Sequence, residues 1–270
     1  MHELARHESL EPQGLAAEMR SGEAAGHAAL PLPPRRAVEA PGPQGFESLE
    51  LIRRHLQFTR RTVRAGEPVQ MAGEAFFRLH VVNAGVFKAM NLAADGREQV
   101  VGLYFKGDWV GFDGIASGHS ACNVIAMDTS EVWSLRYVTL MQSVATVPAL
   151  AHAVHRAMSR QLARDREWRL ALGTLPADAR VADFVRYWAE SLAERGLRSD
   201  QFTLRMTRGE IGTYLSMTLE TVSRAFTRLA RDGLIRFDER GRRDIAIPSI
   251  DALAEFVRLS VNPPEARTLQ

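Results

Sequence analysis

Cysteine is almost absent from this 270-residue sequence, which contains a single copy, Cys122. One cysteine excludes a disulfide within the chain, and it excludes iron–sulfur clusters and zinc sites built from several thiolates. Long hydrophobic runs are also missing, since no stretch approaches the ~20 apolar residues of a membrane helix. The opening residues, MHELARHESLEP, carry charges throughout and lack the apolar core of a secretory signal. These absences predict a cytoplasmic protein with no membrane association.

Lysine is scarce as well, because Lys88 and Lys106 are the only two and the other 32 of the 34 basic residues are arginines. Arginine is suited to planar, bidentate contacts with phosphate, carboxylate or guanine, although codon bias in a GC-rich genome would produce the same excess. The formal net charge is only +2, so the whole chain is not a polycation. Hydrophobic residues make up 46% of the sequence, which is enough for a core without disulfide bonds.

Composition changes sharply after the first 45 residues. Residues 1–45 are predicted to be a disordered tail, because Ala24–Gly45 is rich in alanine, proline and glycine and cannot bury enough apolar surface. Residues 46–146 contain short extended runs separated by glycine turns, which is typical of an antiparallel sandwich or β-roll. The predicted strands cover 77–82, 86–92, 99–105, 124–127 and 131–135, with turns at 83–85, 94–96 and 106–108.

Residues 147–173 change to a helical period, with apolar side chains four residues apart. These are Leu150, Val154, Met158 and Leu162. A helix of about 25 residues exceeds the usual globular length. A long helix with a narrow apolar seam is suited to pairing with a second copy, so we predict a dimerisation helix and a homodimer. Packing of the same seam on the chain's own sheet is the alternative.

Residues 174–260 are the predicted C-terminal domain, and residues 261–270 are a C-terminal tail. The domain opens with an amphipathic helix over Asp178–Arg195, which Gly196 is placed to end. It closes with two predicted strands, 234–237 and 244–247, on either side of an arginine-rich turn. This arrangement predicts a β-wing with a basic tip.

Between these elements lie two helix-start signals. Thr207 and Glu210 have the spacing of a capping box, which predicts a short helix to about Leu215. Thr218 is a second N-cap, and it precedes a predicted helix over 219–232. Two short helices joined by a few residues are typical of a helix-turn-helix.

One face of the second helix carries Glu220, Ser223, Arg224 and Arg228 at spacings of three, four and eight residues. In a DNA major groove, an arginine can donate two hydrogen bonds to guanine, and a carboxylate can accept one from cytosine. A solvated face with an ion pair between Glu220 and Arg224 is the alternative. Residues 202–247 contain nine arginines and six carboxylates, so phosphate contacts would add salt-dependent affinity.

The order β-roll, long helix and winged helix-turn-helix resembles the Crp–Fnr superfamily of bacterial transcription regulators, and most closely its Fnr branch. The run MTRGEIGTYL (206–215) is similar to the first motif helix, LETVSR (219–224) to the recognition helix, and GDWVGFD (107–113) to a β-roll loop. The resemblance covers about residues 46–256. It implies an α+β fold with a cyclic-nucleotide-binding-like β-roll, and it implies a regulator rather than an enzyme.

The resemblance also implies site residues and partners. The family reads double-stranded DNA through residues that correspond to Glu220, Ser223 and Arg224, as a homodimer on a palindromic operator similar to TTGAT–N4–ATCAA. Candidate contacts with the DNA backbone are Thr207, Thr218, Thr221, Arg228, Arg242 and Arg243. Activation requires RNA polymerase, and its candidate contacts are Asp95, Gly96 and Arg97. A plain exposed turn is the alternative for these last three.

The sensor region departs from the family. Oxygen-sensing members carry an N-terminal cysteine cluster, whereas residues 1–121 contain no cysteine and Trp133 stands in place of the β-roll ligand. Members that bind cyclic AMP hold its phosphate with an arginine, and Phe112–Val124 contains Asp113 but no arginine. We therefore expect no cofactor, and control by protein abundance, as in FixK-like members, is the simplest interpretation. A cavity for an unidentified small ligand is the alternative.

Four further hypotheses concern the remaining candidate residues and other classes of protein. Cys122 is a candidate redox switch if its thiolate is accessible, whereas a small buried side chain is the simpler interpretation. His80 and His119 are isolated and their spacing marks no haem site. Residues 46–140 also lack the His-x-His pattern that a cupin-like metal enzyme would need. In a pure small-molecule-binding module the C-terminal helices would serve only for docking, and specific DNA binding would exclude that class.

Overall fold

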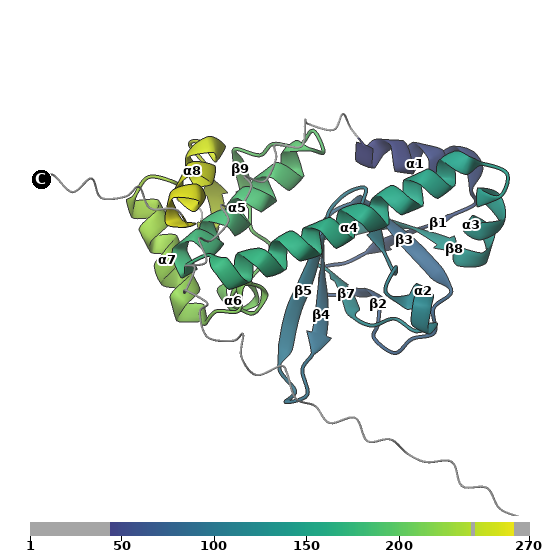
Figure 1. Ribbon diagram of the computed structural model, residues 1–270, viewed down its shortest axis with the longest axis horizontal. Helices are drawn as coiled ribbons and strands as arrows, with labels where there is room; N and C mark the ends of the chain where they lie inside the picture. Colours follow the sequence, from purple (N-terminus) through teal and green to yellow (C-terminus); the bar gives the residue numbers. More distant parts are fainter. Residues whose placement is uncertain (1–43, 239–240, 262–270) are drawn as a thin grey trace, which may run out of the picture. The chain divides into compact units, whose positions relative to one another are not determined.

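The computed structural model describes residues 44–238 and 241–261 of the chain. The predicted tail therefore lies almost entirely outside the described residues, and the C-terminal tail does too. The described residues form a β-roll, a long helix and a C-terminal domain of helices with a small sheet (Figure 1). This arrangement confirms the predicted α+β architecture.

The β-roll is built from two four-stranded sheets in which every pair of neighbours is antiparallel. The first sheet has the order β1 (Thr59–Val63), β8 (Ser130–Arg136), β3 (Arg78–Ala84), β6 (Trp109–Val110). The second has the order β2 (Pro68–Gln70), β7 (Asn123–Ala126), β4 (Phe87–Leu92), β5 (Glu98–Tyr104). Fully buried apolar side chains, among them Val82, Phe87, Val124 and Val132, form the core between them.

All five strands predicted for the β-roll occur, with ends shifted by at most two residues, while β1, β2 and β6 were missed because they are short or mostly polar. The turn predicted at 83–85 is corrected, because Asn83 and Ala84 belong to β3 and only Gly85 turns the chain. Gly85 has φ 84°, and a Cβ there would lie 2.0 Å from the Ser130 hydroxyl oxygen. This position therefore requires glycine.

Three helices pack on the outer side of the first sheet: α1 (Gln44–His55), α3 (Tyr137–Val144) and α4 (Pro148–Thr174). The short α2 (Gly114–Ser117) follows β6. Both α1 and α3 pack against α4 (Figure 1). Since α1 begins at Gln44, it crosses the boundary predicted between residues 45 and 46.

The long predicted helix is present as α4, which has 27 residues and starts with Pro148 in its first turn. Its N-terminal half buries Leu150 and Ala157 against the β-roll, so this part of the seam packs on the chain's own domain. In the C-terminal half, Leu162 and Leu170 are 53% and 48% exposed. None of the helices within the described residues is long and apolar enough to cross a membrane.

The C-terminal domain consists of α5 (Ala177–Ala193), β9 (Gln201–Thr203), α6 (Arg208–Leu215), α7 (Leu219–Arg231), β10 (Arg236–Asp238), β11 (Gly241–Ala246) and α8 (Ile250–Val261). Its sheet has the order β10-β11-β9, and the sequence analysis missed β9. The predicted strand 234–237 is also corrected. Leu234 and Ile235 both donate backbone N–H groups to the carbonyl of Leu229, which closes the end of α7 before β10 begins.

The C-terminal domain contacts the β-roll through α6 and β5. The backbone N–H of Val100 donates to the Thr213 hydroxyl at 3.3 Å, and Lys88 of β4 forms an ion pair with Glu210 of α6. Phe105 of the β-roll packs edge-on against Trp188 of α5, with ring centroids 5.3 Å apart. The described structure thus joins the helix-turn-helix directly to the roll.

Candidate nucleic-acid interface

The first helix of the motif starts with the predicted capping box. The backbone N–H of Glu210 donates to the Thr207 hydroxyl at 3.1 Å, and the N–H of Thr207 donates to the Glu210 carboxylate at 2.7 Å. Burial raises the pKa of Glu210, but Lys88 and Thr207 outweigh this and hold it below its usual value. Glu210 therefore stays ionised, and it fixes the start of α6 and its contact with the roll together.

The turn between the two helices is tight and has a defined geometry. Ser216 adopts a left-handed conformation with φ 55°, and the N–H of Met217 donates to the carbonyl of Gly212 at 2.8 Å. A Cβ at Gly212 would lie 2.6 Å from the carbonyl oxygen of Met217, so a larger residue would push the helices apart. Gly212 and Ser216 thus set the angle at which α7 leaves α6.

The second helix, α7, separates a buried side from an exposed side. Thr218 caps it by accepting the N–H of Thr221 at 3.2 Å, as predicted. Four residues bury their side chains in the domain core: Val222, Ala225, Phe226 and Leu229. On the other side Glu220 and Arg224 are exposed and Ser223 is half-buried. The three side chains predicted to contact bases therefore share the outer face of the first two turns.

The charges on this face suit base readout. The backbone N–H of Glu220 and the Thr218 hydroxyl hold the pKa of the Glu220 carboxyl below its usual value. The carboxylate is therefore ionised at neutral pH and acts only as an acceptor. Arg224 on the next turn supplies donors. A carboxylate and a guanidinium on one face can address a cytosine amino group and a guanine edge respectively.

The residues predicted to contact the DNA backbone differ in how freely they could reach a phosphate. Thr207, Thr218 and Thr221 lie at the N-terminal ends of α6 and α7, where helix N-termini favour phosphate. Arg243 is exposed on β11, while the side chain of Arg242 lies outside the described residues. Arg228 forms an ion pair with Asp178 of α5.

Two residues missed in the sequence hold α7 in place. Asp178 fixes its last turns through Arg228. Arg208 lies over the ring of Phe226, 3.4 Å from its centroid, and also reaches the ring of Phe237 in β10 at 5.7 Å. It thereby connects the wing to α7 by cation–π contacts. No local pattern could have identified either residue, because their partners lie on other elements.

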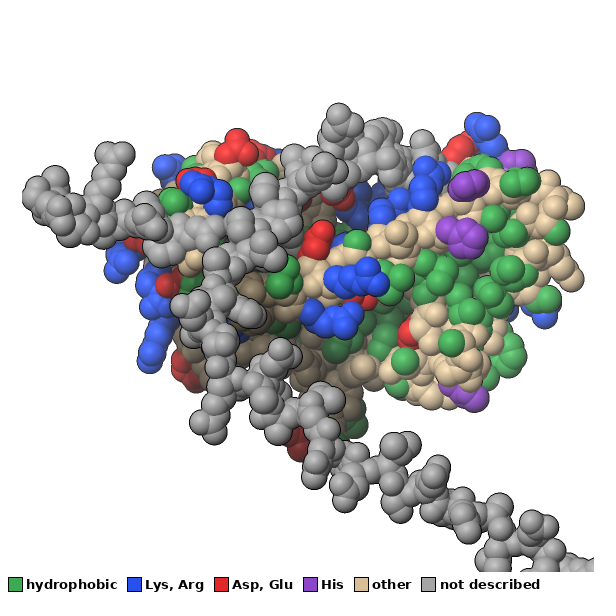
Figure 2. Space-filling model, in the orientation of Figure 1, with side chains coloured by type: hydrophobic (Ala, Val, Ile, Leu, Met, Phe, Trp, Pro, Cys, Tyr) green, Lys and Arg blue, Asp and Glu red, His purple; other side chains and the backbone are tan. Residues whose placement is uncertain are grey.

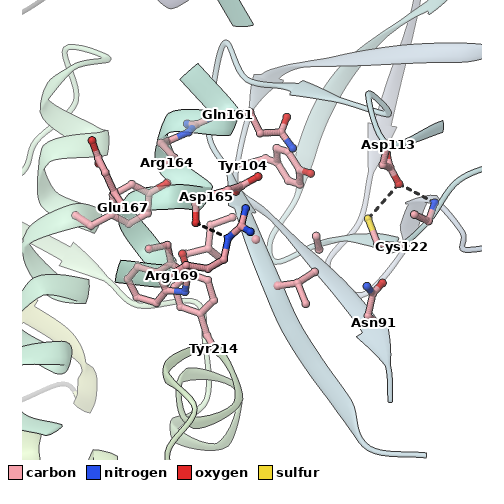
Figure 3. A pocket seen from close by; sticks show the side chains of 17 residues that line it. Asn91, Tyr104, Asp113, Cys122, Gln161, Arg164, Asp165, Glu167, Arg169 and Tyr214 are labelled. Carbon is pink, nitrogen blue, oxygen red and sulfur yellow. Dashed lines mark hydrogen bonds between the residues drawn. The ribbon is translucent and has the colours of Figure 1, made fainter. Parts of the chain in front are cut away.

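A cavity of about 340 Å³ lies between the β-roll and α4, and Tyr187 of α5 and Tyr214 of α6 also line it (Figure 3). Its polar lining comes from Asp113 of the roll and from Arg164, Asp165 and Arg169 of α4, among others. Asp113 accepts the backbone N–H of Ala121 at 2.7 Å. The arginines that line the cavity come from α4, and no arginine occurs in the segment Phe112–Val124.

Cys122 is buried at 7% exposure, and its thiol donates to Asp113 at 3.6 Å (Figure 3). Burial and the adjacent Asp113 charge raise the pKa of the Cys122 thiol to about 12. A buried thiol with a raised pKa is a poor nucleophile. The geometry favours the interpretation of Cys122 as a small buried side chain.

We expect native protein to resist alkylation at Cys122. A rise in pKa from 9.0 to about 12 lowers the thiolate fraction at neutral pH roughly a thousandfold. Treatment with iodoacetamide, read by intact mass, should therefore label denatured protein and leave folded protein unmodified. Rapid labelling of the folded protein, accompanied by loss of DNA binding, would restore the redox hypothesis.

The other candidate ligands occupy structural positions. Trp133 stacks on Phe58 with ring centroids 4.4 Å apart, and its indole N–H donates to Glu131 at 2.9 Å. His80 is largely buried and shares a 2.8 Å hydrogen bond with Ser134, while His119 is exposed. In residues 44–238 and 241–261, no group of three or more His, Cys, Asp or Glu side chains is placed to hold a metal ion.

Comparison with known proteins agrees with this geometry. Residues 60–146 match the cyclic nucleotide-binding domain family, and residues 179–256 match the Crp-like helix-turn-helix domain family. The fumarate and nitrate reduction regulatory protein of Escherichia coli strain K12 is 33% identical over 197 residues, which cover 73% of this chain and 78% of that protein. A similar regulatory protein of Klebsiella oxytoca is 32% identical over 197 residues, covering 73% of this chain and 78% of that one.

Solved structures show the same fold. FixK2 from Bradyrhizobium japonicum aligns with a TM-score of 0.66 at 27% identity, covering 74% of this chain and 97% of that one. TTHB099, a CRP-family transcriptional regulator from Thermus thermophilus, aligns with a TM-score of 0.60 at 20% identity, covering 76% of this chain and 100% of that one. The chain therefore belongs to the Crp–Fnr family of DNA-binding transcription regulators, within its Fnr and FixK branch.

Proposed function

We propose that this regulator binds as a homodimer to a two-fold symmetric operator similar to TTGAT–N4–ATCAA and activates transcription from it. The observation that carries the proposal is the outer face of α7, where Glu220, Ser223 and Arg224 stand together at the capped end of the helix. A dimer would insert two copies of α7 into successive major grooves. We place this activity in the cytoplasm, where RNA polymerase acts on the chromosome.

The roles follow from the chemistry of the three side chains. Arg224 would donate a bidentate pair of hydrogen bonds to guanine, Glu220 would accept from a cytosine amino group, and Ser223 would serve either base. Thr207, Thr218, Thr221, Arg228, Arg242 and Arg243 would bind phosphates and fix the register of α7. For Arg228 this requires release of its ion pair with Asp178.

Dimerisation is supported by α4. Leu162 and Leu170 are large apolar side chains, eight residues apart on this helix, and about half of each is exposed. Residues at this spacing lie near one face, and a second copy of α4 would bury them. The N-terminal half of the helix already packs on the roll, so the pairing surface would be the C-terminal half.

Activation would use the turn at Asp95, Gly96 and Arg97. Asp95 and Arg97 form an ion pair at 2.6 Å with side chains 50% and 84% exposed, and Gly96 takes φ 82° between them. The turn joins β4 and β5, and β5 contacts α6 of the helix-turn-helix. An exposed turn on a hairpin that touches the helix-turn-helix is a suitable contact for RNA polymerase.

A second candidate is a regulator that responds to a small ligand in the cavity between the roll and α4. The volume of about 340 Å³ and the mixed polar lining favour this candidate. Under the main proposal, operator binding needs no ligand in this cavity, and the amount of protein sets how much operator is occupied. Operator binding by purified protein without added ligand distinguishes the two.

The test is fluorescence anisotropy of purified, ligand-free protein on the operator duplex and on a scrambled duplex, at two salt concentrations. We expect tight, selective binding by the wild type. The variant Arg224→Ala should lose about 1–3 kcal/mol on the operator, which is roughly 5–150-fold in Kd, because its guanine contact disappears. The Kd of the variant for the scrambled duplex should be nearly the same as that of the wild type.

A matched control is Arg231→Ala, which removes one arginine from the last turn of the same helix. Arg231 is 72% exposed and pairs with its neighbour Asp232. Its loss should weaken both duplexes by a similar small factor. Equal losses on both duplexes for Arg224→Ala would instead reduce Arg224 to a phosphate contact, and salt-sensitive binding without selectivity would contradict the proposed operator.

A further inference from the structure

Basic side chains collect on one side of α4, away from its exposed leucines. Arg156, Arg160 and Arg164 follow one another at intervals of four residues, so they share a face of the helix. Lys and Arg side chains are visible along this helix in Figure 2. This face meets the turn between β5 and β6 and the end of α5, where Arg195 adds another guanidinium.

A single buried carboxylate serves two of these arginines. Asp108 is 6% exposed and lies 3.1 Å from a terminal nitrogen of Arg164 and 3.2 Å from one of Arg195. Arg195 is held further by the carbonyl of Lys106 at 2.6 Å and by the ring of Phe105, 5.2 Å from its guanidinium carbon. Asp108 therefore holds both guanidiniums beside the turn between β5 and β6.

Arg160 has no such partner. Its half-buried guanidinium makes no hydrogen bond or ion pair with any residue in 44–238 or 241–261. Burial lowers its pKa, and the neighbouring charges of Arg164, Arg156 and Arg195 oppose Asp108 and lower it too. A partly desolvated cation among other cations is unfavourable unless an anion joins it.

We propose that Arg160, Arg164 and Arg195 form a binding site for a phosphate-class dianion, such as a phosphomonoester or pyrophosphate group. The three guanidiniums outnumber the two carboxylates that pair with them, Asp108 and Glu194, so the cluster keeps a positive charge that a phosphate-class anion would offset. Phosphate accepts hydrogen bonds from several directions, as arginines on two different helices require. Arg160 and Arg164 remain partly exposed, so an anion can reach them.

The position of this site gives it a regulatory meaning, which rests on the proposed function. Asp108 belongs to the β-roll, Arg160 and Arg164 belong to α4, and Arg195 follows α5 of the DNA-binding domain. An anion bound there would hold three parts of the regulator together. Arg164 also lines the cavity beside Asp113 and Cys122, whereas Arg160 and Arg195 do not, so the proposed anion site adjoins that cavity without coinciding with it.

The experiment is isothermal titration of the full-length protein with pyrophosphate and with inorganic phosphate, without DNA and with ionic strength held constant by chloride. We expect saturable binding of one anion per chain. Arg160→Gln should weaken it at least about tenfold, as expected for loss of one charge-assisted hydrogen bond. Arg166→Gln is the matched control, because Arg166 is exposed on the same helix and should leave binding unchanged.

Two further measurements test whether the anion binding is specific to this site and to phosphate. Arg224→Ala should bind the anion normally, which separates this site from the DNA-binding face. A dicarboxylate at the same ionic strength should bind much more weakly than pyrophosphate. Unsaturable binding, equal binding by Arg160→Gln and wild type, or equal affinity for the dicarboxylate would overturn the proposal. Operator binding is measured in a separate experiment. A negative result for the anion site therefore does not contradict the proposed DNA-binding function, and the reverse also holds.

Discussion

Replacing Asp108 by alanine should lower the free energy of unfolding by about 3–5 kcal/mol, because it leaves the largely buried Arg195 and the partly buried Arg164 without their buried counter-charge. Burial raises the pKa of the Asp108 carboxyl, yet Arg164 and Arg195 outweigh this and hold it below its usual value. Its side chain also accepts the backbone N–H of Phe105 at 2.9 Å. The loss is measured by urea unfolding of wild type and variant at neutral pH.

The control for this prediction is Asp95→Ala, which removes an exposed carboxylate that also pairs with an arginine. Surface ion pairs contribute about 0–1 kcal/mol, so the control should change stability little. Asp108→Asn keeps the shape of the side chain and should still cost most of the effect, since the charge is lost. A loss below about 1 kcal/mol in both Asp108 variants would mean that solvent compensates the two arginines.

The second large effect is an acid-induced loss of stability that depends on His80. Burial, with added repulsion from Arg61 and Arg78, lowers the pKa of His80 from 6.5 to about 4. Between pH 6.5 and about 4, His80 is protonated in the unfolded chain but stays neutral in the folded chain. The free energy of unfolding therefore falls as the pH falls. The stability that depends on neutral His80 amounts to about 3 kcal/mol. It is fully present above pH 6.5 and is lost as the pH falls toward 4.

The comparison variant is His80→Gln, which cannot titrate but keeps a polar group beside the Ser134 hydroxyl. Free energies of unfolding are measured for both proteins at several pH values between 7 and 4. The wild type should lose about 3 kcal/mol more than the variant over this range. Parallel curves for the two proteins would show that His80 is protonated in the folded state at its ordinary pKa.

The C-terminal motif was predictable because its signals act over a few residues. Thr207 and Thr218 cap helices through hydrogen bonds to residues three positions away. The apolar period of α7 separates its buried and exposed faces without reference to other elements. The helix predicted over 219–232 accordingly runs from Leu219 to Arg231.

The long helix was predictable in extent but not in its contacts. The same apolar seam suits a second copy or the chain's own sheet, and periodicity alone does not separate the two. In the structure Leu150 is buried on the roll while Leu162 is exposed. The N-terminal part of the seam therefore packs on the chain's own sheet, and the C-terminal part stays available for a second copy. Only the position of the roll beside α4 decides this.

The sequence by itself determined the family, the order of the modules and the face of α7 that carries Glu220, Ser223 and Arg224. The tertiary structure alone decided the pairings Asp108–Arg164, Asp178–Arg228 and Lys88–Glu210, which join residues 56, 50 and 122 positions apart. The reason is the range of the interactions. Caps and periodicity act within one or two helical turns, whereas the burial of a charge depends on groups that distant elements bring beside it.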